Sequence, residues 1–246
     1  MITLENVHKT LGTKHVLRGV NLAIRAGETM VIVGSSGTGK SVSLKHMVGL
    51  MRPDEGRVLV DGADLTHANR EQLALLRRKF GVLFQSGALI NWMTVGENVA
   101  LPLQEHSDLS AEEIDQRVRE KLEWVGLTDY RHLRPAEISG GMKKRAGLAR
   151  AIIHEPQIIL YDEPTSGLDP VLSRHIDQLI RNLQRRLGVT SVVVTHDLHS
   201  AFTVGDRVAM LYEGQVAAVG TPDEFRKHPH PFVQSFINAQ FVTGHE

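Results

Sequence analysis

Apolar and polar positions follow two different spacings in the first part of the chain. Residues 2–7 and 16–24 are short, partly alternating runs, which are typical of strands. Residues 30–33 form a continuous apolar run, and the apolar residues within 42–48 then recur at helical spacing. This pattern predicts a strand, a glycine-rich connection and a helix in that order.

The mixed pattern continues as far as residue 85. Residues 57–60 are predicted to form a strand that turns at Asp61-Gly62, a dipeptide typical of hairpins. A helix over 71–79 and a strand over 80–84 follow. The alternation of strands and helices predicts an α/β fold.

Residues 86–138 differ in character, because strand-like runs are absent from them. Residues 111–125 predict an amphipathic helix with an apolar stripe at Ile114, Val118, Leu122 and Val125. Strand-like runs return at 158–161, 191–194, 207–212 and 215–219. We therefore expect a helical insertion between strands of a sheet.

Composition narrows the class of protein. The 246 residues suit one large domain, or one domain with a smaller subdomain. The formal net charge is zero, so there is no electrostatic reason to expect nucleic acid as a partner. No apolar run approaches the roughly 18 residues that span a bilayer, and the start does not have the form of a signal peptide. We therefore expect any work at a membrane to pass through a partner.

Cysteine is absent, so neither a disulfide nor a thiolate metal site is expected. The 13 histidines are scattered, and we expect no metal other than Mg²⁺. The basic runs at 77–79, 143–145 and 185–186 are interpreted as solvated helix faces.

A P-loop pattern follows the apolar run 30–33. Its glycines allow backbone N–H groups to converge on an anion, and the following helix adds the positive end of its dipole. Its lysine supplies a cation for the β- and γ-phosphates, and its last hydroxyl supplies a ligand for Mg²⁺. The residues are Gly34, Ser35, Ser36, Gly37, Thr38, Gly39, Lys40 and Ser41. The pattern predicts a nucleoside triphosphate site.

Two carboxylates follow the apolar run 158–161. Asp162 and Glu163 point in different directions at the carboxyl end of the predicted strand, where ligands bind in open α/β sheets. With a P-loop in the same chain, we expect Asp162 to hold Mg²⁺ and Glu163 to be the general base for the attacking water.

A second helix is predicted to begin with two glycines. Ser139 is a natural N-cap before Gly140 and Gly141, and the apolar stripe of this helix comprises Met142, Ala146, Ala149 and Ile153. Such a helix start can hold an anion, but taken alone it is also typical of a capped core helix.

Three further features are Gln85, residues 166–169 and His196. Together with the motifs above, they have the order and spacing of an ABC-transporter ATPase subunit, which nearly the whole chain resembles. The resemblance implies a P-loop NTPase fold with a mixed-sheet core, a β subdomain and a helical subdomain. It also implies a head-to-tail dimer that binds two ATP, each between one copy's P-loop and the other copy's 139–142 segment. Gln85 would contact Mg²⁺ and water, His196 would touch the γ-phosphate, and Asp169 would cross the dimer interface.

The segments 84–89, 101–106 and 138–142 further resemble the Mla-type ATPases. That resemblance implies phospholipid as cargo, membrane permease subunits, an MCE-domain lipid-binding protein and possible regulation by a small subunit. It places the protein on the cytoplasmic face of the cell membrane as a peripheral subunit. The expected layout is one domain over 1–246, with a core of 1–85 and 155–225, a helical subdomain over 86–154 and a tail over 226–246.

The sequence departs from the family pattern at two positions. Residues 8–15 contain no aromatic side chain to stack on adenine, so we expect Leu11, Val16 or a cation to support the base. Met142 stands where glutamine is commonest, which leaves the anion contact to Ser139 and backbone groups.

Three questions stay open at this level. Residues 86–102, with Trp92, either dock a permease or pack internally. The apolar stripe of 231–242 either folds back on its own domain or reaches a partner subunit. The rival functions are transport of another small solute and a soluble ABC-type regulatory ATPase.

Overall fold

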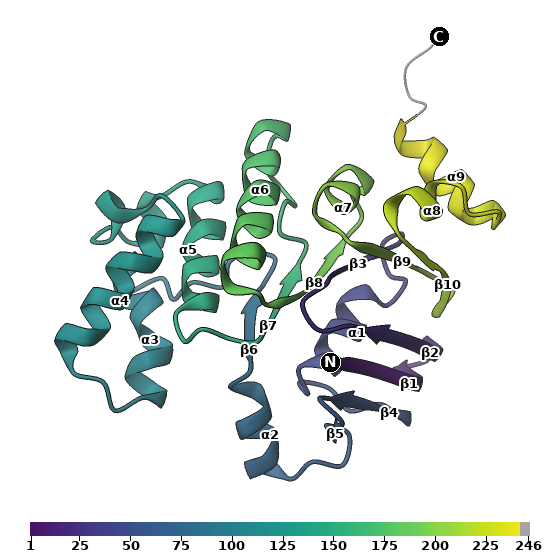
Figure 1. The fold of residues 1–246 in the computed structure, drawn as a ribbon, viewed down its shortest axis with the longest axis horizontal. Helices are drawn as coiled ribbons and strands as arrows, with labels where there is room; N and C mark the ends of the chain where they lie inside the picture. The colour runs from purple at the N-terminus through teal and green to yellow at the C-terminus, as the bar shows by residue number, and fades with distance from the viewer. Residues whose placement is uncertain (242–246) are drawn as a thin grey trace. The chain divides into compact units, whose positions relative to one another are not determined.

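The computed structural model describes residues 1–241. The chain, drawn in Figure 1, divides into two compact units. The strand-rich unit consists of Met1–Arg78 and the chain from Thr190 onward, and the helical unit consists of Lys79–Val189. The predicted division into a core, a helical subdomain and a tail stays a prediction, and residues 242–246 of that tail lie outside the described residues.

An antiparallel sheet in the strand-rich unit has the order β2-β1-β4-β5. Its strands are β1 (Ile2–Leu11), β2 (Lys14–Ile24), β4 (Glu55–Val60) and β5 (Ala63–Asp64). The predicted hairpin is confirmed, since Val60 pairs with Ala63. Asp61 and Gly62 both have positive φ, 52° and 79°, as a two-residue turn of this type requires.

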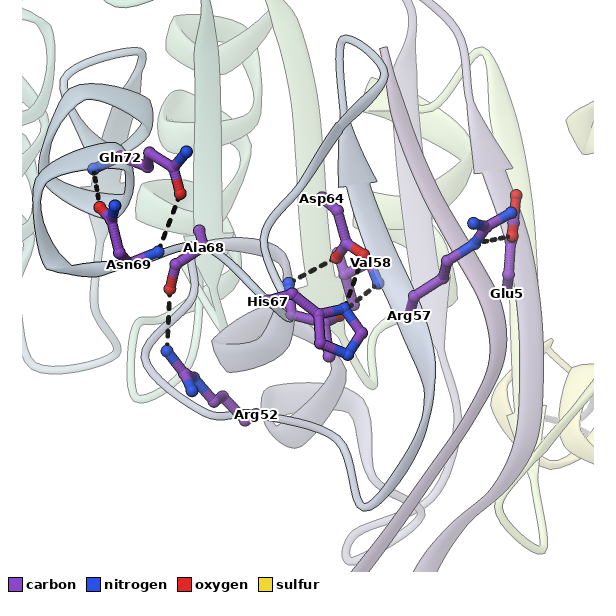
Figure 2. A network of polar contacts seen from close by, with 10 residues as sticks. Glu5, Arg52, Arg57, Val58, Asp64, His67, Ala68, Asn69 and Gln72 are labelled. Atoms are coloured by element: carbon purple, nitrogen blue, oxygen red, sulfur yellow. Dashed lines mark hydrogen bonds and ion pairs between the residues drawn. The ribbon is translucent and has the colours of Figure 1, made fainter.

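The connection from this sheet to helix α2 (Arg70–Arg77) is held by polar side chains (Figure 2). Asp64 accepts hydrogen bonds from the backbone N–H of Thr66 at 2.7 Å and from the ring of His67 at 2.8 Å. Asn69 and Gln72 form a reciprocal capping box at the start of the helix, with both bonds at 2.9 Å. These bonds fix where the helix begins.

Parallel strands carry the site in the strand-rich unit. β3 (Thr29–Val33) lies between β8 (Thr190–Thr195) and β9 (Arg207–Tyr212), and β10 (Gln215–Gly220) pairs antiparallel with β9. Every residue of β3 and β8 is buried, as expected for parallel strands with the apolar runs 30–33 and 192–194. Besides α2, the helices of this unit are α1 (Lys40–Met47), α7 (Leu198–Val204), α8 (Pro222–Arg226) and α9 (Pro231–Phe241).

The helical unit contains two parallel strands, β6 (Phe80–Leu83) and β7 (Ile158–Asp162). Its helices are α3 (Val95–His106), α4 (Ala111–Trp124), α5 (Gly140–Ile152) and α6 (Pro170–Leu187), with short 3₁₀ turns at Thr128–Tyr130 and Pro135–Glu137. The predicted stripe of α4 is confirmed, because Val118, Leu122 and Val125 are buried in one core with Ala146, Ala149 and Ile153 from α5 and its C-terminal cap.

The interpretation of residues 143–145 as a solvated face is wrong for Lys144, which is only 5% exposed. The helix turns this residue inward, in line with buried Leu148 four positions later.

Trp92, in contrast, is exposed although it is a large apolar residue. It is 79% exposed, so it does not pack inside the described chain, whereas Val95 nearby is fully buried.

Candidate functional site

The P-loop connects the end of β3 to the start of α1. Lys40, the first residue of α1, is 7% exposed, and its ammonium group donates to the carbonyl oxygens of Gly34 at 2.8 Å and Ser35 at 3.0 Å. Thr38 donates its hydroxyl to the same Ser35 carbonyl at 3.0 Å. The loop is therefore folded around its own lysine, which places the cation beside the backbone that leads into the helix.

Glycine is required at two positions of this loop. A Cβ on Gly34 would stand 2.5 Å from the carbonyl oxygen of Leu211, which is backbone and cannot give way cheaply. Gly39 has φ of 102°, and a Cβ there would stand 2.6 Å from Leu17. As the N-cap of α1, Gly39 has no side chain that could bond to the first turn, so this turn presents backbone N–H groups and the positive end of the helix dipole. The cradle fits a polyphosphate.

A cavity of about 390 Å³ lies beside the P-loop in the same unit. Residues from the start of β2, from the P-loop, from the β9–β10 turn and from α9 line it, including Lys14, Val16, Ser36, Tyr212 and Phe232. The rings of Tyr212 and Phe232 stack with centroids 3.9 Å apart. The sequence predicted Leu11, Val16 or a cation as the support for the base, and Val16 and Lys14 do line this cavity. It did not point to the two aromatic residues, which lie about 170 and 190 positions after Ser41.

His196 follows β8 and is exposed. Its carbonyl oxygen accepts a hydrogen bond from the side-chain amide of Gln240 at 2.8 Å, and the amide oxygen of Gln240 accepts from the backbone N–H of Leu198 at 2.8 Å. Asp197 caps the next helix by accepting from the N–H of His199 at 2.7 Å. Helix α9 thus folds back on its own unit, and its Gln240 forms hydrogen bonds to the backbone on both sides of Asp197.

The carboxylates of the helical unit stand at the end of β7, as predicted. Asp162 is the last residue of the strand, and both it and Glu163 are partly buried. Glu163 has φ of 49°, a left-handed conformation that a side chain with a Cβ adopts only when its surroundings hold it there. Its carbonyl oxygen accepts from the ammonium group of Lys144 at 2.9 Å and from the backbone N–H of Ser166 at 3.2 Å.

Gln85 lies in the loop after β6, and its side-chain amide donates to the hydroxyl of Ser166 at 3.2 Å. The same loop is held by α5, because Arg150 donates to the carbonyl oxygens of Gly87 at 2.9 Å and Ala88 at 2.8 Å. The residue predicted to sense Mg²⁺ is therefore connected to the turn that follows Glu163.

Ser139 is the N-cap of α5, as predicted, and its hydroxyl accepts from the backbone N–H of Met142 at 3.3 Å. Asp169 is the N-cap of α6 and accepts from the N–H groups of Val171 and Leu172, both at 2.9 Å. This second cap is a local role that the sequence analysis did not assign.

The predicted site residues fall into two groups. The strand-rich unit holds the P-loop residues 34–41 and His196, and the helical unit holds Gln85, Ser139, Gly140, Gly141, Asp162, Glu163 and Asp169. Serine hydroxyl, glutamine and carboxylate oxygens, as offered by Ser41, Gln85 and Asp162, are hard ligands of the kind that Mg²⁺ accepts. Within residues 1–241, no helix is long and apolar enough to cross a membrane.

A glycine cradle on a buried lysine and a carboxylate pair at the end of a parallel strand define a P-loop nucleoside triphosphatase. Comparison with known proteins narrows this class. Residues 17–166 match the family model described as ABC transporter. The chain belongs to this family, and it is an ATP hydrolase of the ABC type that binds ATP.

The chain is similar along nearly its whole length to curated proteins. It is 43% identical to the "Probable ribonucleotide transport ATP-binding protein mkl" of Mycobacterium leprae, over 98% of this chain and 70% of that protein. It is 38% identical to the "Intermembrane phospholipid transport system ATP-binding protein MlaF" of Escherichia coli K12, over 97% of this chain and 88% of that protein. The fold matches the dimeric post-hydrolysis state of the ATP-binding cassette MJ0796 bound to ADP and Pi, with a TM-score of 0.83 and 37% identity over 90% of this chain and 99% of that chain.

Proposed function

We propose that two copies of this chain bind two ATP head to tail and hydrolyse them to drive a membrane permease. The cradle around Lys40 carries the proposal, because it presents a cation and a helix start to one polyphosphate. The start of α5 lacks such a lysine cradle and is suited to complete the site of the other copy with Ser139, Gly140 and Gly141. The similarity to a cassette whose structure is described as dimeric and bound to ADP and Pi supports this arrangement.

The residues divide the chemistry among them. Glu163 takes a proton from the water that attacks the γ-phosphorus, and the bond from that phosphorus to the bridging oxygen breaks to release ADP and phosphate. His196 contacts the γ-phosphate, and Asp169 lies at the dimer interface. Ser41, Asp162 and Gln85 hold Mg²⁺, which neutralises phosphate charge when it is bound.

The base of ATP occupies the cavity beside the P-loop. Lys14 donates to the carbonyl of Gly37 at 3.3 Å at one wall of this cavity, and the stacked pair of Tyr212 and Phe232 stands at another. An aromatic surface supports a base through stacking, which tolerates different bases. This assignment adds an aromatic surface to the expected support, of which Val16 and the cation of Lys14 also line the cavity.

The cargo we propose is phospholipid, because the similarity to MlaF extends over almost the whole chain and 88% of that protein. A ribonucleotide or another small solute is the second candidate, favoured by the name of the Mycobacterium leprae relative at 43% identity. Partners of the first system would be permease subunits, an MCE-domain lipid-binding protein and a small regulatory subunit, with the ATPase on the cytoplasmic face of the cell membrane. Trp92, which is exposed at the start of the α3 region, is the residue we propose to dock the permease.

The hydrolysis proposal is tested with Glu163→Gln and Lys40→Ala. Glu163→Gln should retain ATP binding and lower turnover by roughly 10² or more, the scale of a lost general base. Lys40→Ala should abolish nucleotide affinity in calorimetry, because the loop loses its central cation. Near-normal hydrolysis by the first variant would remove Glu163 from this role, and unchanged binding by the second would count against the P-loop site.

The cargo proposal is tested by purifying the protein with its membrane partners from detergent extract. Co-purification of an MCE-domain protein with the permease supports phospholipid, and ATP-dependent movement of labelled phospholipid between vesicles would confirm it. The other result is a permease that co-purifies without an MCE-domain protein, in a complex whose ATPase rate changes with a ribonucleotide and not with phospholipid. That result supports a ribonucleotide or another small solute as the cargo.

A further inference from the structure

Lys144 has a chemical environment that ordinary packing does not explain. The side chain is 5% exposed on α5, and burial lowers the pKa of its ammonium group, while the nearby Glu163 and Asp162 oppose that shift. A buried position that served packing alone would be filled more favourably by an apolar side chain of similar length. The lysine therefore has a use for its charge and its N–H donors.

The bond that Lys144 makes indicates this use. Its ammonium group donates to the carbonyl oxygen of Glu163 at 2.9 Å. Glu163 is held at φ of 49°, and the peptide that carries this carbonyl determines the direction of the Glu163 side chain. A charged donor forms a stronger hydrogen bond to a carbonyl than a neutral one does, so it is suited to hold a strained peptide.

The same carbonyl belongs to a chain of contacts within the helical unit. It accepts from the backbone N–H of Ser166 at 3.2 Å, and the hydroxyl of Ser166 accepts from Gln85 at 3.2 Å. Lys144 also lies little more than one helical turn after Ser139, the cap of α5. Lys144 thus connects two parts of the helical unit. One is the start of α5, which is proposed to face the ATP of the other copy, and the other is the turn that carries Glu163.

We propose that Lys144 is a positioning residue that holds the Glu163 peptide in its hydrolytic orientation and ties that orientation to the start of α5. This inference rests on the proposed function of Glu163 as general base. A shift of α5 when Ser139 meets a nucleotide would move the ammonium group and hence the Glu163 carbonyl. Hydrolysis at one P-loop then depends on what the same copy's helix start has bound.

The test compares Lys144→Met with Lys143→Met in the full-length protein, reconstituted with its permease where the ATPase requires it. Lys143 is the adjacent lysine on α5 and is partly exposed, so it controls for the loss of one charge. Lys144→Met should lower kcat by about 10- to 100-fold, the scale of a misplaced catalytic group, and leave KM and ATP affinity within about twofold. Lys143→Met should keep kcat within about twofold, and Lys144→Arg should recover most of the lost kcat because it keeps a charged donor.

The outcomes distinguish a positioning role of Lys144 from a purely structural one, and both from a failure of the general-base role proposed for Glu163. A Lys144→Met protein with normal kcat overturns the inference even if its melting temperature falls, because the role would then be structural. If Lys144→Met yields no folded protein, Lys144→Arg is compared with Lys144→Gln, whose amide is too short to replace the ammonium group. Arginine should exceed glutamine several-fold in kcat, and equal values would overturn the inference. Glu163→Gln, assayed alongside, detects failure of the general-base assignment independently.

Discussion

Gln240 forms two hydrogen bonds to the backbone around His196, and they lead to a prediction for which the same helix offers a control variant. Gln240→Ala removes the hydrogen bonds to the carbonyl of His196 and from the N–H of Leu198, both 2.8 Å long. Gln234 lies on the same helix and also makes two bonds to backbone, to the carbonyls of Arg226 at 3.0 Å and His228 at 2.9 Å. Gln234→Ala therefore removes a similar number of bonds from α9 without touching the His196 loop.

The expected size of the effect of Gln240→Ala on kcat follows from these two hydrogen bonds. A net hydrogen bond contributes about 0.5–1.5 kcal/mol, and Gln240 is exposed, so the lower end applies and two bonds give about 1 kcal/mol. That free energy corresponds to a change of about fivefold in the equilibrium that keeps the loop in place. Since His196 is proposed to contact the γ-phosphate, Gln240→Ala should lower kcat by up to about fivefold with little change in ATP affinity.

The assay is steady-state ATP hydrolysis by both variants, with urea unfolding as the measure of stability. The two variants should lose similar stability, but only Gln240→Ala should lose kcat. Equal kcat in the two variants would refute the idea that α9 steadies the His196 loop. A loss well above tenfold would also refute it, because two exposed bonds cannot supply that much free energy.

The remaining predictions concern the base cavity and a partly buried histidine. Phe232→Leu should weaken ATP binding by about tenfold through lost stacking. Phe241→Leu on the same helix should not, because Phe241 stacks on Phe202 and neither ring lines the cavity. Equal affinities of the two variants in fluorescence titration with ATP would show that the cavity does not hold the base. Burial lowers the pKa of His154 below its usual 6.5, and its ring bonds to the carbonyl of Phe80 at 3.1 Å. The pKa of His154 is lower in the folded protein than in the unfolded chain, so the stabilising contribution of the neutral ring is complete above about pH 6.5 and is lost as the pH falls toward the folded-state pKa. The free energy of unfolding of His154→Gln should therefore fall less than that of the unaltered protein between about pH 7 and pH 5.5. Parallel curves would contradict this assignment.

The sequence predicted those parts of the fold that depend on interactions between residues close together in the chain, such as turns and helix caps. The Asp61-Gly62 hairpin and the Ser139 cap depend on backbone geometry within a few residues, so the sequence alone predicts them. The strand ends were less well placed, because β1 extends to Leu11 where the alternation had already weakened. Pairing with β2 as far as Lys14 supplies the bonds that the pattern did not predict.

Features that depend on distant segments could not be predicted in this way. A basic run on a helix is typical of a solvated face, whereas α5 turns Lys144 inward and the tertiary fold places the carbonyl oxygen of Glu163 opposite its ammonium group. Phe232 and Tyr212 form an apolar pair from separate segments, and nothing in either segment indicates that the P-loop lies beside them. The residues that complete the candidate site are thus those whose partners the tertiary fold supplies.

Helix α5 connects the parts of the helical unit that the proposed mechanism requires to move together. It begins at the Ser139 cap, and Lys144 holds the Glu163 peptide farther along the helix. Arg150 then holds the loop after Gln85, and the helix approaches that loop so closely that a Cβ on Gly147 would stand 2.9 Å from the carbonyl oxygen of Gly87. A helix is stiff along its axis, so a displacement at its start reaches both contacts without a separate mechanism. The missing side chain at residue 147 therefore allows α5 to lie against the loop after Gln85, so that one rigid element links this loop to the proposed partner-facing segment and the proposed general base.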